Sequence, residues 1–167
     1  MGDGWIHRES SNPSFKFAVQ EREYVEYVLE KLSEHVCSVN EYKDGLFTLT
    51  THSNPDFKKF ESWYDSGSKN FPNSLQLTPT IFRHWYACDG SLVRNGPSSY
   101  ANIGISNESE SIDKIQSMIS SAGLPEPRVN EWRETEAQLV WTVDDTEKIL
   151  QYTEESVPGY EYKWRKS

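Results

Sequence analysis

Cysteine is scarce in this sequence, and long apolar runs are missing from it. The chain has two cysteines in 167 residues and no Cys-x-x-Cys pair, which argues against a disulfide framework and against a thiolate zinc site. No apolar run approaches the ~18 residues of a membrane-spanning helix, and no secretory signal is visible at the N-terminus. We therefore expect an intracellular, cytoplasmic protein.

Basic residues are outnumbered as well. The chain carries 17 Lys and Arg against 26 Asp and Glu, for a formal net charge of −9. The net negative charge, taken alone, argues against a nucleic-acid partner, because phosphate contacts need basic side chains. Binding depends on where the charges lie, however, so an acidic outer face can coexist with a basic groove. The aromatic content of 13% excludes an acidic disordered tail.

Several catalytic patterns are also absent. The sequence has no glycine-rich phosphate-binding loop, and no Cys/His or Ser/His pair is arranged as a nucleophile with its base. Its four histidines show no metal-ligand spacing with one another or with cysteine. No intein splicing residues frame the chain, since it neither begins with Cys or Ser nor ends with His-Asn.

What the sequence does contain is an internal repeat. Residues 38–50, "SVNEYKDGLFTLT", resemble residues 128–142, "RVNEWRETEAQLVWT". Each copy continues from a Val-Asn-Glu-aromatic-basic core into alternating apolar residues, the pattern of a half-buried strand. Chance similarity between two amphipathic hairpins is the alternative interpretation.

The segments around the two hairpins match in kind and order. Apolar residues recur at helical spacing before each hairpin, over residues 24–32 and 112–119. A strand-like segment precedes each of these helices, over residues 14–20 and 99–106. Each half therefore reads helix, strand, strand, helix, strand, strand, helix, and this repeated order favours duplication over chance.

A loop rich in Gly, Ser, Asn and Pro separates the halves. We predict a first repeat over residues 1–70, a linker over residues 71–77 and a second repeat over residues 78–167.

A short, very apolar helix opens the second repeat. Thr78 is a suitable N-cap and Pro79 a suitable first helical residue. The helix is expected to end at Asp89, with Gly90 allowing the exit turn.

Two motifs resemble those of the LAGLIDADG homing endonucleases. Residues 77–92, "LTPTIFRHWYACDGSL", are similar to the signature helix of that family, in which Leu-Thr-Pro precedes an aromatic-rich helix and Asp-Gly. Residues 157–164, "VPGYEYKW", resemble its Pro-x-x-x-Tyr-Lys tail. The sequence departs from the eponymous motif at Arg83, His84 and Ala87, which replace small or acidic residues.

The resemblance implies an α+β protein with a duplicated αββαββα fold, whose two curved antiparallel sheets form a saddle on the DNA major groove. It implies a site-specific double-stranded DNA endonuclease, encoded as a mobile element in an intron or intein. A non-catalytic nucleic-acid binder, such as an intron maturase-like protein or a degenerate LAGLIDADG domain, is the alternative. The negative charge favours a third possibility, a protein-interaction module without nucleic acid.

The resemblance also implies a divalent metal, Mg²⁺ or Mn²⁺. Such hard ions activate water, stabilise a leaving oxygen and prefer carboxylate ligands. The two Asp-Gly pairs offer one carboxylate each, Asp3 and Asp89, and the preceding residues, Gly2 and Cys88, complete the expected metal site. Taken alone, each Asp-Gly is an ordinary turn pair.

Further residues are expected near the cleavage centre and along the DNA. Gln20 and Ser106 end matching strands where the family places polar residues, and Lys163 resembles a family lysine near the scissile phosphates. Basic side chains of the saddle are candidates for DNA contacts, or else solvated surface charges: Arg8, Lys16, Lys43, Arg94, Arg128 and Arg133. The matched pair Lys43 and Arg133 is favoured among them.

The first Asp-Gly pair has only two residues before it, whereas the second follows a full helix. If Met1 is the true start, the first signature helix is truncated and the helix over residues 78–89 lacks its partner. Phe82, Trp85 or Tyr86 is then exposed. We expect such a chain to cleave weakly or not at all unless a partner supplies the helix; a whole chain is expected to be a monomer with pseudo-twofold symmetry.

Overall fold

The computed structural model describes residues 4–8, 11–65, 68–69, 72, 74–96, 98–106, 112–133 and 136–165. The chain divides into two compact units. The N-terminal unit consists of Asp3–Gly67 with Pro158–Tyr160, and the C-terminal unit consists mainly of Ser68–Val157 and Glu161–Ser167. Among the described helices, none is long and apolar enough to cross a membrane. The division of the sequence into two repeats at residues 71–77 stays a prediction.

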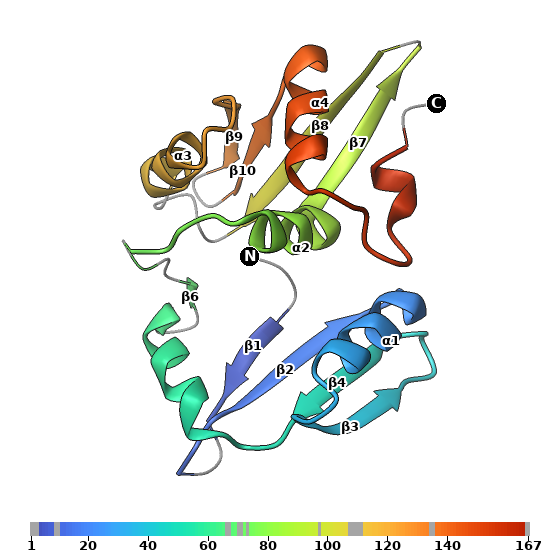
Figure 1. Ribbon diagram of the computed structural model, residues 1–167, viewed down its shortest axis with the longest axis vertical. Coiled ribbons are helices and arrows are strands. Elements are labelled where there is room, and N and C mark those ends of the chain that lie inside the picture. Colours follow the sequence, from blue (N-terminus) through green and yellow to red (C-terminus); the bar gives the residue numbers. More distant parts are fainter. Residues whose placement is uncertain are drawn as a thin grey trace. The chain divides into compact units, whose positions relative to one another are not determined.

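The N-terminal unit is built on a four-stranded antiparallel sheet with the strand order β1-β2-β4-β3 (Figure 1). Its elements, in chain order, are β1 (Gly4–His7), β2 (Ser14–Val19), α1 (Arg22–Lys31), β3 (Val36–Glu41), β4 (Phe47–Thr51), the 3₁₀ helix η1 (Pro55–Trp63) and β5 (Tyr64–Asp65).

The C-terminal unit repeats this topology, with the strand order β7-β8-β10-β9. Its elements are β6 (Ser68–Lys69), α2 (Pro79–Asp89), β7 (Gly90–Asn95), β8 (Ser98–Ser106), α3 (Ile112–Ser121), β9 (Arg128–Arg133), β10 (Glu136–Val140), α4 (Val143–Tyr152) and the 3₁₀ helix η3 (Glu161–Lys163). The predicted α+β class and the duplicated order of strands and helices are confirmed.

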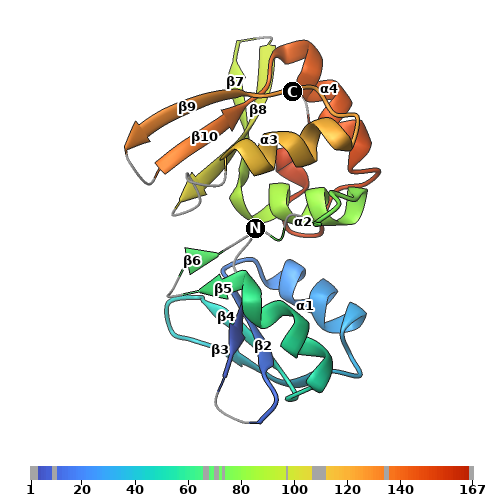
Figure 2. The same ribbon diagram turned by 90° about the vertical axis from the view of Figure 1, so that its left-hand side faces the viewer.

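Alternation along the strands separates the two faces of each sheet. In the C-terminal unit, Ile103, Ile105 and Leu139 point toward the helices and are at most 1% exposed. The helices α2, α3 and α4 lie on the same side of this sheet (Figure 2). In the N-terminal unit, Phe17 and Leu49 form the corresponding core. Both sheets therefore bury one face within their own unit.

The aromatic residues of α2 contradict one expectation from the sequence. Phe82, Trp85 and Tyr86 are at most 1% exposed, so the prediction that one of them is exposed is wrong. The reason is their spacing, which places them on one stripe of the helix that faces their own unit. The ring of Phe82 packs edge-on against those of Trp141 and Tyr152, each at a centroid distance of 6.0 Å.

A different stripe of α2 is half-buried. It carries Ile81, His84 and Cys88, which follow one another at helical spacing. Burial, together with the charge of the neighbouring Arg83, lowers the pKa of His84. The imidazole is therefore held in its neutral form near neutral pH.

Candidate functional site at the end of helix α2

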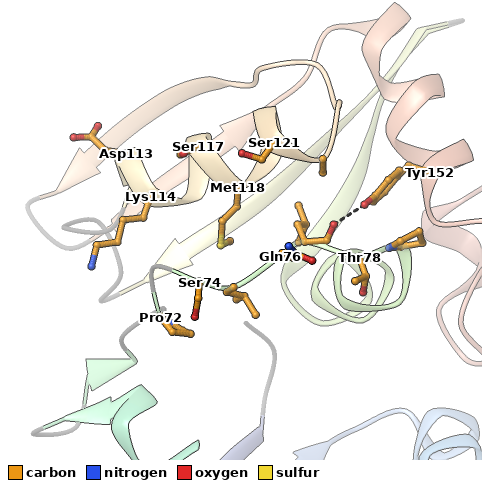
Figure 3. Close-up of a pocket in the computed structure, with 14 residues that line it drawn as sticks. Pro72, Ser74, Gln76, Thr78, Asp113, Lys114, Ser117, Met118, Ser121 and Tyr152 are labelled. Carbon is orange, nitrogen blue, oxygen red and sulfur yellow. Dashed lines mark hydrogen bonds between the residues drawn. The ribbon is translucent and has the colours of Figure 1, made fainter.

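Helix α2 begins as its sequence predicts. Thr78 Oγ1 accepts a hydrogen bond from the backbone N–H of Ile81 at 3.3 Å, and Pro79 is the first helical residue. The hydroxyl of Tyr152 donates to the carbonyl of Leu77 at 2.6 Å, which ties the entry of the helix to the end of α4 (Figure 3). The predicted helix with its N-cap is confirmed.

The end of α2 places Asp89 at a junction without a loop. The helix ends at Asp89, and β7 starts at the next residue, Gly90. The N–H of Gly90 donates to the carbonyl of Tyr86. Asp89 is half-buried, so its carboxylate is set by two rigid elements rather than by a flexible turn.

Gly90 serves this junction in a way that differs from the expectation. Its backbone is extended, with φ −89° and ψ 159°, so the exit needs no left-handed turn. A side chain would instead collide with the ring and the carbonyl of Tyr86. Gly90 is therefore required for close approach.

Lys163 lies beside the same helix end, but its ammonium is turned inward. The side chain is buried, and Nζ donates to the carbonyl of Ala87 at 2.5 Å. The last carbonyls of a helix have no partner within the helix and attract cations. The structure thus brings Lys163 near Asp89. The ammonium of Lys163 has at least one hydrogen-bond acceptor in the backbone of α2.

The face of the C-terminal sheet away from the helices carries polar side chains next to this junction, together with Val140, and Asn102 within it is buried. Ser91, Asn102, Val140 and Arg128 lie in register across its four strands. In the adjoining row Gly104 is exposed, and a Cβ placed there would lie 3.8 Å from the backbone oxygen of Asp89. Gly104 therefore lies beside the backbone of Asp89 at the end of α2.

The N-terminal sheet has a similar open face. Trp5, Lys16, Thr50 and Ser38 lie in register across it. Trp5 is 38% exposed and Lys16 is half-buried. This row combines an aromatic ring, a cation and hydroxyl groups.

The other predicted site residues are scattered. Gln20 is exposed after β2, and Lys43 is exposed in the turn between β3 and β4. Arg8 is exposed, and its Nη2 donates to the carbonyls of Glu61 and Tyr64. Gln20 and the turn that holds Lys43 lie at the end of the sheet where Val19 pairs with Phe47. Arg8 follows β1 at the opposite end, where His7 pairs with Ser14.

Some predictions concern residues of which little or nothing is described. Gly2 and Asp3 lie outside the described residues. Ser106 and Arg133 are the last residues of β8 and β9, but their side chains are also outside the described part. Their assigned roles stay predictions.

The donor set at the helix end suits a hard metal ion only in part. The Asp89 carboxylate is the kind of ligand that Mg²⁺ or Mn²⁺ prefers, whereas the thiol of Cys88 is soft, so that Cys88 can offer only its carbonyl. Within the described ranges, no group of three or more His, Cys, Asp and Glu residues could hold a metal. Asp89 fits a metal whose other ligands are phosphate and water oxygens.

A cavity of about 920 Å³ lies elsewhere in the C-terminal unit. It is bounded by the segment before α2 and by α3, and Met118, Gln76 and Ser74 are among its lining side chains (Figure 3). Among the described residues that line it, Asp113 and Lys114 are charged. None of the predicted site residues that the structure describes lines this cavity, which is therefore separate from the junction at Asp89.

Comparisons with known proteins bear on the fold and the family. The structure is similar to the homing endonuclease I-WcaI bound to its DNA recognition sequence, with 14% identity and a TM-score of 0.81 over 99% of this chain and 82% of that one. It is also similar to I-SmaMI bound to an uncleaved DNA target in the presence of calcium ions, with 11% identity and a TM-score of 0.63 over 96% and 83% of the two chains.

A third similar structure is the N-terminal LAGLIDADG domain of DUF199/WhiA, with 14% identity and a TM-score of 0.62 over 93% of this chain and 77% of that one. At such identities these likenesses show the fold. No curated protein sequence matches the chain significantly. The sequence model of the LAGLIDADG DNA endonuclease family matches residues 1–123. This match spans well over half of the chain and confirms the resemblance of the signature helix: the chain belongs to the LAGLIDADG DNA endonuclease family.

Proposed function

We propose that the chain is a site-specific endonuclease that hydrolyses phosphodiester bonds of double-stranded DNA with a divalent metal ion, Mg²⁺ or Mn²⁺. The observation that carries the proposal is the position of Asp89. Asp89 ends α2 at the point where the helix passes without a loop into a sheet whose other face carries Ser91, Asn102 and Arg128. Family membership and the DNA-bound state of I-WcaI support the same function.

In this proposal Asp89 holds the metal ion with one carboxylate. A bound hard cation supplies an activated water and neutralises charge at the scissile phosphate. The half-buried position of Asp89 limits the conformations of its side chain, so the carboxylate is oriented before the substrate arrives. We assign Asp3 the equivalent role for the second DNA strand, and Gln20 a role near the same centre. Calcium in the I-SmaMI complex is consistent with a divalent site.

The two open sheet faces are the proposed DNA surface. Side chains of Ser, Thr, Asn and Gln can read base edges in the major groove, and Lys and Arg contact phosphates. Lys16 in one sheet and Arg128 in the other are placed for such contacts. We propose that the two repeats act as pseudo-symmetric halves of one monomer, each serving half of the target.

The test begins with selection of a target. A randomised duplex library is incubated with the chain in Ca²⁺, bound sequences are recovered, and cleavage is then started with Mg²⁺. We expect cleavage of both strands that EDTA abolishes. The Asp89→Asn variant should bind the selected DNA with similar affinity but lose at least about a hundredfold in single-turnover rate. Undiminished cleavage by this variant would remove Asp89 from the centre.

A non-catalytic nucleic-acid binder is the second candidate. It is favoured by the ligand count at the junction, because the described residues contain no cluster of three metal-binding side chains. This candidate predicts salt-sensitive binding of the selected DNA without metal-dependent cleavage by the unchanged chain.

A further inference from the structure

We propose that the segment Glu161–Arg165, here named the tail clamp, positions Asp89 by holding the chain on both sides of it. In this role Lys163 and Arg94 are positioning residues rather than ligands of DNA phosphates. The functional consequence rests on the proposed endonuclease activity, whereas the clamp itself is a statement about the folded chain.

The clamp holds the chain before Asp89 through Lys163. Its buried ammonium donates to the carbonyl of Ala87, two residues before Asp89. Ala87 is itself fully buried, so water has no access to satisfy that carbonyl. The lysine therefore completes the last turn of α2 at the point where the helix dipole favours a positive charge.

Tyr86 secures the same segment from the helix side. Its hydroxyl donates to the carbonyl of Lys163 at 3.0 Å. Burial raises the pKa of the Tyr86 phenol, so the group is protonated and acts as a donor near neutral pH. The ring of Trp164 packs edge-on against that of Tyr86 at a centroid distance of 5.0 Å. Tyr86 and the clamp thus fix each other.

Arg94 holds the chain after Asp89. It lies on β7, which leaves the helix directly at Gly90. Its Nη2 donates to the carbonyl of Tyr162 at 3.0 Å and to that of Arg165 at 3.2 Å. The guanidinium thus binds the backbone on both sides of Lys163. Because no loop separates α2 from β7, a displacement of Lys163 or of Arg94 is transmitted to Asp89.

The matched variants are Arg94→Gln and Arg22→Gln. Both remove a guanidinium from an exposed side chain, but Arg22 belongs to the N-terminal unit and pairs with Glu26. We expect Arg94→Gln to accelerate amide hydrogen exchange over residues 86–92 by about tenfold, because charged hydrogen bonds that resist local opening are lost. Arg22→Gln should leave exchange there unchanged.

Activity gives a second measurement on the same variants. Arg94→Gln should lower the single-turnover cleavage rate by about tenfold through misplacement of Asp89, with no change in DNA affinity or in its salt dependence. Lys163→Met, which keeps the buried stem and removes the amine, should act in the same direction. Arg94→Gln stays informative if Lys163→Met fails to fold.

Two results would overturn the clamp. One is unchanged exchange over residues 86–92 in Arg94→Gln. The other is a salt slope of DNA binding reduced by about one, which is the signature of a lost phosphate contact. If the unchanged chain does not cleave DNA, the proposed function fails, and the exchange measurement still decides whether the clamp exists.

Discussion

The absence of a side chain at Gly90 allows the end of α2 to pack closely against β7. A Cβ at this position meets the ring and carbonyl of Tyr86, although the backbone is extended. We predict that Gly90→Ala lowers the free energy of unfolding by about 1–3 kcal/mol, the usual cost of overpacking a buried site. Chemical denaturation measures this change.

Gly104→Ala is the matched control for that prediction. Gly104 is exposed in a strand, and the nearest atom to a new Cβ is the Asp89 oxygen at 3.8 Å. Alanine should fit there and change stability by no more than about 1 kcal/mol, in the stabilising direction. Equal losses in the two variants would show that glycine at position 90 is not needed for space.

Sequence reasoning succeeded where a residue acts locally. Thr78 and Pro79 were predictable as the start of α2, because an N-cap and its first turn are encoded within four residues. Lys163 was predicted near the scissile phosphates and Arg94 as a DNA contact, but the partners of their side chains lie 76 and 68 residues away. No local pattern encodes such partners, which only the folded chain brings together.

At the scale of elements, Thr146 joins α4 to β8. It is fully buried, its Oγ1 donates to the carbonyl of Thr142, and the same oxygen accepts from the N–H of Ala101 at 2.8 Å. Thr146→Val keeps the shape but leaves the Ala101 N–H without that acceptor. We predict a loss of about 1–3 kcal/mol in the free energy of unfolding, measured by denaturation.

Thr80→Val provides the control, because Thr80 is an exposed residue in the first turn of α2. Its substitution should change stability by less than about 0.5 kcal/mol. If both threonine variants lose the same stability, the buried hydrogen bond is not what joins the two elements.

The elements themselves were largely predictable. Alternation and helical spacing identified the strands and helices of both repeats, and the shared strand order confirms their equivalence. The orientation of α2 was not predictable, because periodicity defines an apolar stripe but not what covers it. Phe82 is covered by Trp141 and Tyr152. Both residues come much later in the sequence, so no local pattern identifies them as its neighbours.

For the whole molecule, the distribution of charge matters more than its sum of −9. Exposed carboxylates gather on helices, such as Glu23 and Glu26 of α1 and Asp144 and Glu147 of α4. On the faces of the sheets away from the helices, polar side chains such as Ser38 and Thr50 lie in register with Lys16. Arg128 and Glu136 lie on the corresponding face of the other sheet. An acidic protein can therefore present surfaces that tolerate DNA.

This distribution predicts how salt affects binding. Lys16 lies on the open face between Trp5 and Thr50, so Lys16→Gln should reduce the slope of log K against log[salt] by about one on selected duplex DNA. Lys31 is an exposed lysine of α1 that lies over the ring of Tyr27, and Lys31→Gln should leave the slope unchanged. Matching slopes for the two variants would exclude Lys16 from the DNA surface.

The long separation between Ala87 and Lys163 also bears on when the site forms during synthesis. The contact spans 76 residues, so a ribosome completes α2 and Asp89 well before it makes the lysine that fixes them. Domains generally fold as they emerge, from the N-terminus onward. A nascent chain therefore carries the carboxylate before it carries the clamp, and full geometry at Asp89 arises only once the segment around Lys163 has left the exit tunnel.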